Sequence, residues 1–312
     1  MNFTSAVILS LLLALATGCG GPLPPQDPFN LGEAKESLSR GNHWYERGCY
    51  QEARAFYQSG LESARLSDNI LLIIRAQNSL GAAALAEGDP NAAAAYLEQA
   101  LNITSGRPDQ PELDKVLGNL GALAFQMNRP KDAEDFWLQA RKIAEERRLS
   151  AAPYYCNLAR LYLETKRPDD FNQMADLALA AAEADPDDKL TLADALNLAG
   201  HQARAGGRTA EAEALLLRAL ELDRGTENTT GLAQDTEALG LVMIDLERYS
   251  EAAGYLDRAF FLWLALGKDR GADRVLALLQ NLARQHQHPQ KLEPYQAARR
   301  HPAPHRLANQ CP

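Results

Sequence analysis

The chain has 312 residues, 46% of them hydrophobic, and a formal net charge of -9. This length is large for one compact core, whereas an array of repeats escapes that limit because each unit packs only against its neighbours. The acidic balance argues against a general nucleic-acid binder, which is usually basic. The end of the chain differs, because five Lys and Arg residues stand against one Glu from Arg284 onward.

Residues 1–18 form an apolar run that is short for a membrane span. Small residues at positions 16–18 precede Cys19, and the stretch resembles the signal of a bacterial lipoprotein. The resemblance implies that Cys19 becomes the lipidated first residue. Because no Asp follows it, the resemblance also implies delivery to the periplasmic side of the outer membrane. Residues 19–30 would be a lipidated, Pro-rich tether. An ordinary secretory signal with a fortuitous Cys is the alternative.

A helix–turn–helix pattern over residues 78–101 recurs along the body of the chain. Its apolar residues return at three- and four-residue steps on both sides of Gly88-Asp89-Pro90, which predicts two amphipathic helices joined by a tight turn. Two such helices cannot bury both apolar stripes alone, so we expect a stack of them. The small residue Gly81 has equivalents at a spacing close to 40: Gly41, Gly121, Ala159, Ala199, Gly240 and Ala283.

The repeating unit resembles the tetratricopeptide repeat (TPR). The first unit carries Gly41, then the aromatic residues Trp44 and Tyr45, then Gly48 and Ala53, in the order of the TPR consensus. The run from Cys156 to Tyr162 is similar to the long repeats of kinesin light chain. The resemblance implies an all-α fold, a TPR-like α-solenoid of about six helix pairs. We assign the solenoid to residues 31–286, including a capping helix over 269–286, and a basic, flexible tail to 287–312.

The concave groove of the solenoid is the predicted binding surface. Asn is a mediocre helix former, yet it recurs at one place in the first helix of several units. The TPR resemblance implies that these residues line the groove and hold the backbone of a peptide, with specificity left to their neighbours. The alternative is that they hydrogen-bond adjacent helices. The predicted groove residues are Asn78, Asn119, Asn157, Asn197, Asn281, Tyr45, Phe125, Arg160 and Arg284.

No residues stand at catalytic or metal-ligand spacing, so we predict no enzyme activity, no cofactor and no metal. We interpret Cys156 as a packed apolar residue rather than a nucleophile. Pairing of Cys49 with Cys311 would require the tail to fold back along most of the array. We therefore expect both thiols to be unpaired, with intermolecular pairing as the alternative.

Together these patterns predict a lipid-anchored scaffold of the periplasm and outer membrane. Its partner would be a protein or peptide in the concave groove, in the assembly of a cell-envelope complex, and nucleic acid is not expected. Two other functions stay open. The protein is alternatively a regulatory subunit or adaptor of a cell-wall enzyme, or a non-lipidated secreted or cytoplasmic TPR signalling protein.

Overall fold

The structure is a computed structural model that describes residues 31–105, 111–285, 295, 297 and 298, and the regular structure of these residues is helical throughout. Helices pair along the chain as the sequence predicts, and α13 follows the sixth pair. The helices are α1 (Leu31–Glu46), α2 (Tyr50–Leu66), α3 (Ile70–Glu87), α4 (Pro90–Ser105), α5 (Leu113–Gln126), α6 (Pro130–Glu146), α7 (Ala152–Glu164), α8 (Pro168–Glu183), α9 (Lys189–Ala205), α10 (Thr209–Gly225), α11 (Thr229–Asp245), α12 (Tyr249–Ala265) and α13 (Asp269–Gln285).

Several predictions fall on residues that the structure does not describe. The signal over 1–18, the lipidation site Cys19, the tether to residue 30, Cys311 and most of the tail over 287–312 lie outside the described ranges. Within those ranges, no helix combines the length and apolar character needed to cross a bilayer.

One type of short turn joins most of the helices. Each such turn has one residue with φ between 47° and 84°. The N–H of this residue donates to the carbonyl oxygen three residues earlier, as Gly88 does to Leu85. The N–H of the residue after it donates to the carbonyl oxygen five residues earlier, as Asp89 does to Ala84. Since most turns span three residues, the 40-residue period comes from long helices rather than long links. The left-handed residues recur at steps of about 20 or about 40 positions: Gly48, Asp68, Gly88, Asn128, Arg148, Lys166, Gly207, Glu227, Glu247 and Gly267.

Within five of the six helix pairs, a small residue on the first helix accepts a large side chain from the second. A Cβ added to Gly81 would lie 2.6 Å from Cγ of Leu97, so the helices could not approach as they do if residue 81 carried a side chain. The same contact, 16 residues apart, occurs at Gly41 and Tyr57, Gly121 and Trp137, Gly200 and Leu216, and Gly240 and Leu256. The assignment of Ala199 as the key residue of the fifth unit is therefore wrong by one position, because Gly200 makes the contact.

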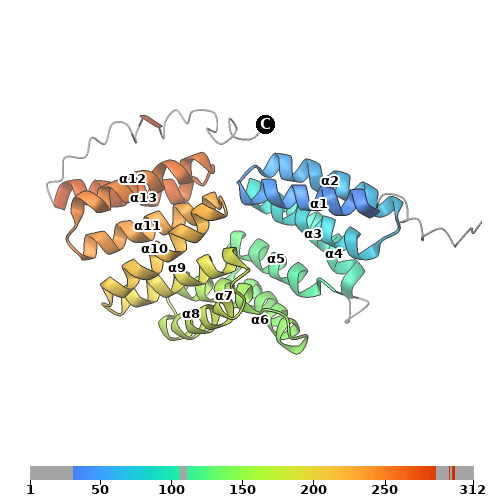
Figure 1. Cartoon of the computed structure of the whole chain (residues 1–312), viewed down its shortest axis with the longest axis horizontal. Coiled ribbons are helices and arrows are strands. Elements are labelled where there is room, and N and C mark those ends of the chain that lie inside the picture. The colour runs from blue at the N-terminus through green and yellow to red at the C-terminus, as the bar shows by residue number, and fades with distance from the viewer. Residues whose placement is uncertain (1–30, 106–110, 286–294, 296, 299–312) are drawn as a thin grey trace, which may run out of the picture.

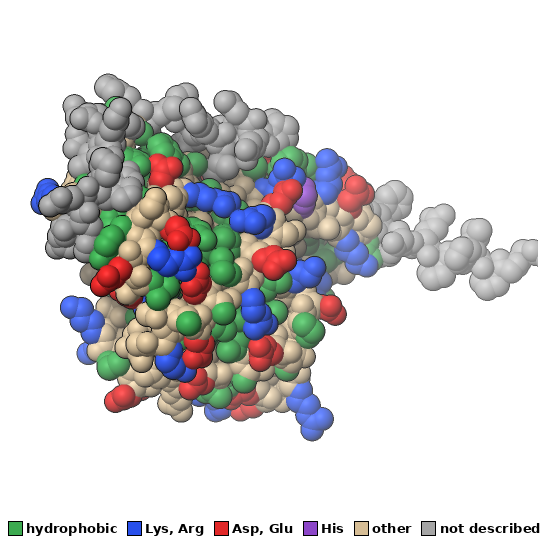
Figure 2. Space-filling model, turned by 60° about the vertical axis from the view of Figure 1, so that its left-hand side comes forward, with side chains coloured by type: hydrophobic (Ala, Val, Ile, Leu, Met, Phe, Trp, Pro, Cys, Tyr) green, Lys and Arg blue, Asp and Glu red, His purple; other side chains and the backbone are tan. Residues whose placement is uncertain are grey.

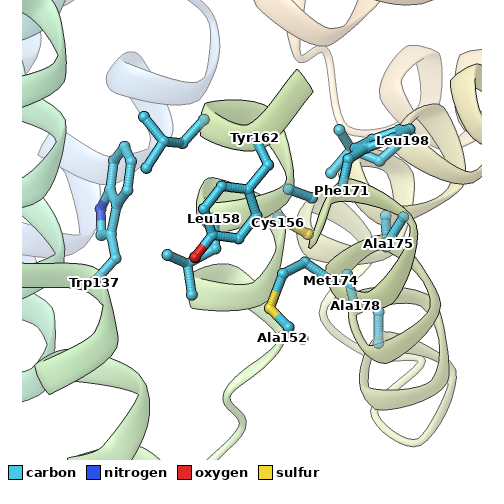
Figure 3. Close-up of a cluster of buried hydrophobic side chains, with 14 of the residues drawn as sticks. Trp137, Ala152, Cys156, Leu158, Tyr162, Phe171, Met174, Ala175, Ala178 and Leu198 are labelled. Atoms are coloured by element: carbon cyan, nitrogen blue, oxygen red, sulfur yellow. The ribbon is translucent and has the colours of Figure 1, made fainter. Parts of the chain in front are cut away.

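The apolar core is a series of overlapping clusters rather than one centre. Successive clusters contain side chains from α1 through α4, from α3 through α7, from α5 through α10, and from α9 through α13. Figure 3 shows the third of them, in which Cys156 lies among Leu158, Phe171 and Met174. Cys156 is 1% exposed and is a free thiol, which confirms that it is a packed residue.

The array bends until its two ends meet (Figure 1). The α1–α2 turn contacts the α10–α11 turn, where Arg47 Nε lies 3.2 Å from Glu227 Oε2 and the hydroxyls of Tyr50 and Thr230 are 3.4 Å apart. Beside them, the Nζ of Lys268 donates to the carbonyl oxygen of Ala86 at 2.8 Å. These three contacts join segments about 180 residues apart in the chain. We call them the seam.

Cys49 lies in the seam turn, and it is 3% exposed and disulfide-bonded. The expectation of an unpaired thiol is wrong at this residue. That expectation assumed an array whose ends stay far apart, whereas the first and sixth units touch.

Two described residues of the segment assigned to the tail, Tyr295 and Ala298, pack on the apolar cluster of α11, α12 and α13. Tyr295 is 6% exposed, and its hydroxyl donates to Asp257 Oδ1 of α12 at 2.8 Å. Its ring lies 5.2 Å from that of Phe260. The chain is therefore anchored to α12 at this point.

Candidate functional site

Two cavities line the inner side of the bend, which is formed by the first helix of each pair. The larger, of about 980 Å³, lies along α3, α5 and α7, and we call it the groove cavity. The smaller, of about 570 Å³, lies between α1, α7, α9 and α11 and is bounded on one side by the seam, so we call it the seam cavity. Both are lined by Pro153 and Asn157, which makes them two compartments of one inner surface.

A row of Asn side chains runs along the groove cavity. Asn119 donates from Nδ2 to Oδ1 of Asn78 at 2.8 Å, which joins α5 to α3, so these two residues also make a helix–helix bond of the kind that the alternative interpretation expects. Asn157, on α7, follows in the same lining and has no hydrogen-bond partner among the described residues. An amide offers both a donor and an acceptor, which is the pair of groups that a peptide bond requires.

The carboxylates of the groove cavity have partners within the protein. Glu112 accepts from Arg75 at 2.9 Å and lies 3.1 Å from the Nζ of Lys115. Asp114 accepts a hydrogen bond from the hydroxyl of Tyr154 at 2.7 Å. Burial, with the charge of Asp114 next, raises the pKa of Tyr154, so the phenol stays a proton donor. These charges fix the walls, and they leave Asn157 and the remaining amide groups of Asn78 and Asn119 to meet a ligand.

The seam cavity is aromatic on one wall and charged on another. Tyr45 and Tyr50 lie with their ring centres 5.3 Å apart, and burial raises the pKa of Tyr45. Opposite them, Arg160 Nη2 lies 2.5 Å from Asp194 Oδ1. Since this ion pair joins α7 to α9, it holds the wall shared with the groove cavity. Cys156 also lines the cavity, and burial raises the pKa of its thiol.

The structure brings five of the predicted groove residues to this inner surface and places the other four elsewhere. Tyr45, Asn78, Asn119, Asn157 and Arg160 line the two cavities. The others are Asn197, Phe125, Asn281 and Arg284.

Asn197 is 4% exposed and donates to Asp235 Oδ1 at 2.7 Å, so it makes the helix–helix bond of the alternative interpretation. Phe125 packs on Trp137, with the centres of the two rings 5.7 Å apart. Asn281 and Arg284 are exposed on α13 and do not line either cavity. Asn197 differs because the buried Asp235 lies within hydrogen-bond distance, and Asn281 and Arg284 differ because α13 is the last of the described long helices.

Several residues that line the cavities were not predicted from the sequence, although the repeat period relates some of them. Arg75 and Lys115 are 40 residues apart, as are Asp114 and Tyr154, so the repeat period already relates them. The seam residues Tyr50 and Thr230 carry no such signal, because their contact depends on the curvature of the whole array.

The surface outside the cavities carries charges of both signs. On the face in Figure 2, basic and acidic side chains are interspersed and form no single patch. Several charged side chains of the array form ion pairs between consecutive units, such as Arg248 with Glu213 and Arg204 with Asp245.

Comparison with known proteins supports the fold. The tetratricopeptide repeat family profile matches residues 36–105. No curated protein sequence matches the chain. Among solved structures, a Rap protein complexed with Competence and Sporulation Factor has a TM-score of 0.58 and 14% identity over 85% of this chain and 77% of that one.

NprR in complex with its cognate peptide NprX has a TM-score of 0.57 and 14% identity over 86% and 77% of the two chains. BtubC from P. vanneervenii has a TM-score of 0.50 and 18% identity over 83% and 93%. These likenesses concern the fold. The described chain is a TPR-like α-solenoid, whose first two helix pairs carry the recognisable repeat.

Proposed function

We propose that the protein is a scaffold that binds an extended peptide segment of a partner protein along the groove cavity. The Asn row carries this proposal. Asn78, Asn119 and Asn157 present amides to an open inner surface whose carboxylates already have partners. Such a surface suits a neutral, polar peptide backbone better than a strongly charged ligand. The same fold holds a cognate peptide in NprR, which is compatible with a peptide ligand here.

The test replaces the row and measures binding. Partners are captured from membrane extracts with the wild-type protein, and the captured segment is then titrated against the variant Asn78→Ala/Asn119→Ala/Asn157→Ala. Because both members of the Asn78–Asn119 bond are removed together, no buried partner is left unsatisfied. Each lost hydrogen bond contributes about 0.5–1.5 kcal/mol, so binding should weaken by roughly 10-fold to 10³-fold.

The matched control changes three exposed Asn residues on second helices. Asn91, Asn102 and Asn172 lie on α4 and α8 and line neither cavity. Replacing all three by Ala should leave the affinity unchanged. Equal affinities for the row variant, the control and the wild-type protein would place the binding surface elsewhere.

We also propose that Cys19 is lipidated and holds the scaffold on the periplasmic side of the outer membrane. The support is the sequence of residues 1–19 alone. Cys19→Ser should release the protein from membranes or leave the signal unprocessed, because a lipoprotein terminus provides the several acyl chains that stable anchoring needs. Wild-type protein that is found in the cytoplasm with Met1 intact would contradict the anchor.

The captured partner also separates the two other functions. A cell-wall enzyme would indicate an adaptor or regulatory subunit. A cytoplasmic or secreted signalling partner, together with loss of the anchor, would indicate a signalling protein. A component of an envelope assembly would support the scaffold.

A further inference from the structure

The seam differs from the other joints between units. Consecutive units share apolar clusters, whereas none of the clusters of described residues contains side chains from both the first and the sixth unit. The contacts across the seam are polar, and its ion pair is partly exposed, with 36% of Arg47 and 59% of Glu227 accessible to solvent. Exposed ion pairs are weak and screened by salt. Apart from the disulfide of Cys49, the seam is therefore held more weakly than the joints between consecutive units.

The seam cavity depends on this joint. One wall comes from Asn42, Tyr45 and Tyr50 of the first unit, and another comes from Thr230 and its neighbours at the start of α11. These walls are held against each other by the Tyr50–Thr230 contact and the Arg47–Glu227 pair. If the ends move apart, the walls separate and the compartment loses one side.

The sixth-unit side of the seam is held rigidly. Asn228 accepts from the N–H of Gly231 at 3.2 Å and donates to Asp223 Oδ1 at 2.8 Å, so it fixes the turn that carries Glu227 and Thr230. A Cβ on Gly231 would lie 1.8 Å from Asp223 Oδ2, so the backbone of the turn packs directly against this carboxylate. Opening therefore separates whole units rather than unfolding the turn.

We propose that the array opens and closes at the seam, and that a ligand reaching from the groove cavity into the seam cavity holds it closed. This inference rests on the proposed function, because its ligand is the peptide of the groove. A ligand that touches both walls of the seam cavity binds the closed array better than the open one, and so shifts the equilibrium towards closure. Closure is then the step that sets the affinity of the scaffold.

The first experiment measures closure without any ligand. Small-angle X-ray scattering of the full chain at low ionic strength gives the radius of gyration of the wild type, of Arg47→Glu, of Glu227→Arg, and of the variant with both changes. Each single change places like charges across the seam and should increase the radius and the maximum dimension. The double change restores an opposite pair and should restore the wild-type values. Segments outside the described residues add equally to every sample.

Two controls make the result specific. Arg248→Glu disrupts an ion pair between consecutive units, and it should leave the radius unchanged because apolar clusters hold that joint. All samples are also measured with a reducing agent, because Cys49 of the seam turn is disulfide-bonded. Reduced single variants with the radius of the wild type would overturn the seam as the opening joint.

The second experiment measures coupling with the partner segment captured in the groove titration. Adding that segment to Glu227→Arg should reduce its radius towards the wild-type value. The apparent affinity is proportional to the fraction of molecules that are closed. A variant with about a tenth of its molecules closed should therefore bind about tenfold more weakly. The double variant should recover the affinity.

The two experiments distinguish this inference from the proposed function. Wild-type affinity in an expanded Glu227→Arg variant would overturn the coupling and leave the groove proposal standing. Loss of binding on replacing the Asn row, with no effect of the seam variants on affinity, would likewise overturn the coupling alone.

Discussion

Gly121 of α5 and Trp137 of α6 lie so close that a Cβ on Gly121 would be 2.4 Å from the indole Nε1. The indole cannot move aside freely, because Nε1 donates to the carbonyl oxygen of Gly118 at 2.9 Å and the ring is 2% exposed. This contact sets the separation of the two helices, and it is one of five equivalent contacts, each within one helix pair.

Replacing Gly121 by Ala should therefore lower the free energy of unfolding by about 1–3 kcal/mol, because the core must shift to admit the methyl group. Urea denaturation gives the size of the loss, and amide exchange should locate it in α5 and α6. Gly254 of α12 is the matched control, since nothing lies within 4 Å of its added Cβ. Gly254→Ala should stabilise by about 0.5–1 kcal/mol. Equal effects at the two positions would contradict the packing role of Gly121.

Asn197 and Asn157 look alike in the sequence but should respond differently to substitution. Asn197→Ala leaves Oδ1 of the buried Asp235 without its donor, which costs about 1–3 kcal/mol of stability. Asn157→Ala removes no hydrogen bond to a described residue and should leave stability nearly unchanged. Thermal unfolding of both variants separates the two roles. A comparable loss in Asn157→Ala would show that this residue, too, is structural.

Stability should fall as pH rises, because of a buried carboxyl pair. Burial, and next the negative charge of Asp223, raise the pKa of Asp235 well above the ordinary carboxyl range, and burial also raises the pKa of Asp223. Above about pH 4 the unfolded chain releases protons that the folded chain keeps, so the free energy of unfolding decreases with pH. One such proton contributes a slope of at most about 1.4 kcal/mol per pH unit.

Asp235→Asn removes the titrating group while keeping an amide oxygen that can accept from Asn197. Its stability should decrease less steeply between about pH 5 and pH 8 than that of the wild type. Urea denaturation at several pH values measures both slopes. Parallel pH profiles would assign the dependence to other groups.

Cys156 should resist thiol reagents in the folded protein. Its side chain is 1% exposed, and burial raises the pKa of the thiol, so little reactive thiolate is available. Labelling with an aromatic disulfide reagent should be slow in native conditions and fast in denaturant. Rapid native labelling at Cys156 would mean that the wall of the seam cavity opens frequently.

The sequence predicts the fold well because its signals are local. Small residues such as Gly81 and apolar steps of three and four are properties of one helix pair, and the pairs repeat. The error at Ala199 arises where the neighbouring Gly200 offers a second small residue, and only the contact with Leu216 decides between them. Several of the left-handed turn residues are also hidden, since residues such as Arg148 and Lys166 carry no turn signature.

The candidate site is predicted less completely, because it depends on long-range geometry. The period places Asn78, Asn119 and Asn157 on one surface, but the same reasoning cannot tell that Asn197 faces Asp235. A single buried carboxylate 38 residues away changes its role. The seam is further beyond reach, since the contact of Tyr50 with Thr230 follows from small rotations summed over the array.

The meeting of the first and sixth units limits how this protein can evolve. A repeat array ordinarily gains or loses modules by duplication and deletion with little penalty, since each module interacts only with its neighbours. Here the insertion or deletion of one module would change the curvature between the first and sixth units, so that Arg47 no longer meets Glu227. We therefore expect homologues that keep the closed array to conserve their number of modules, and those with a different number to have lost the charges at both positions.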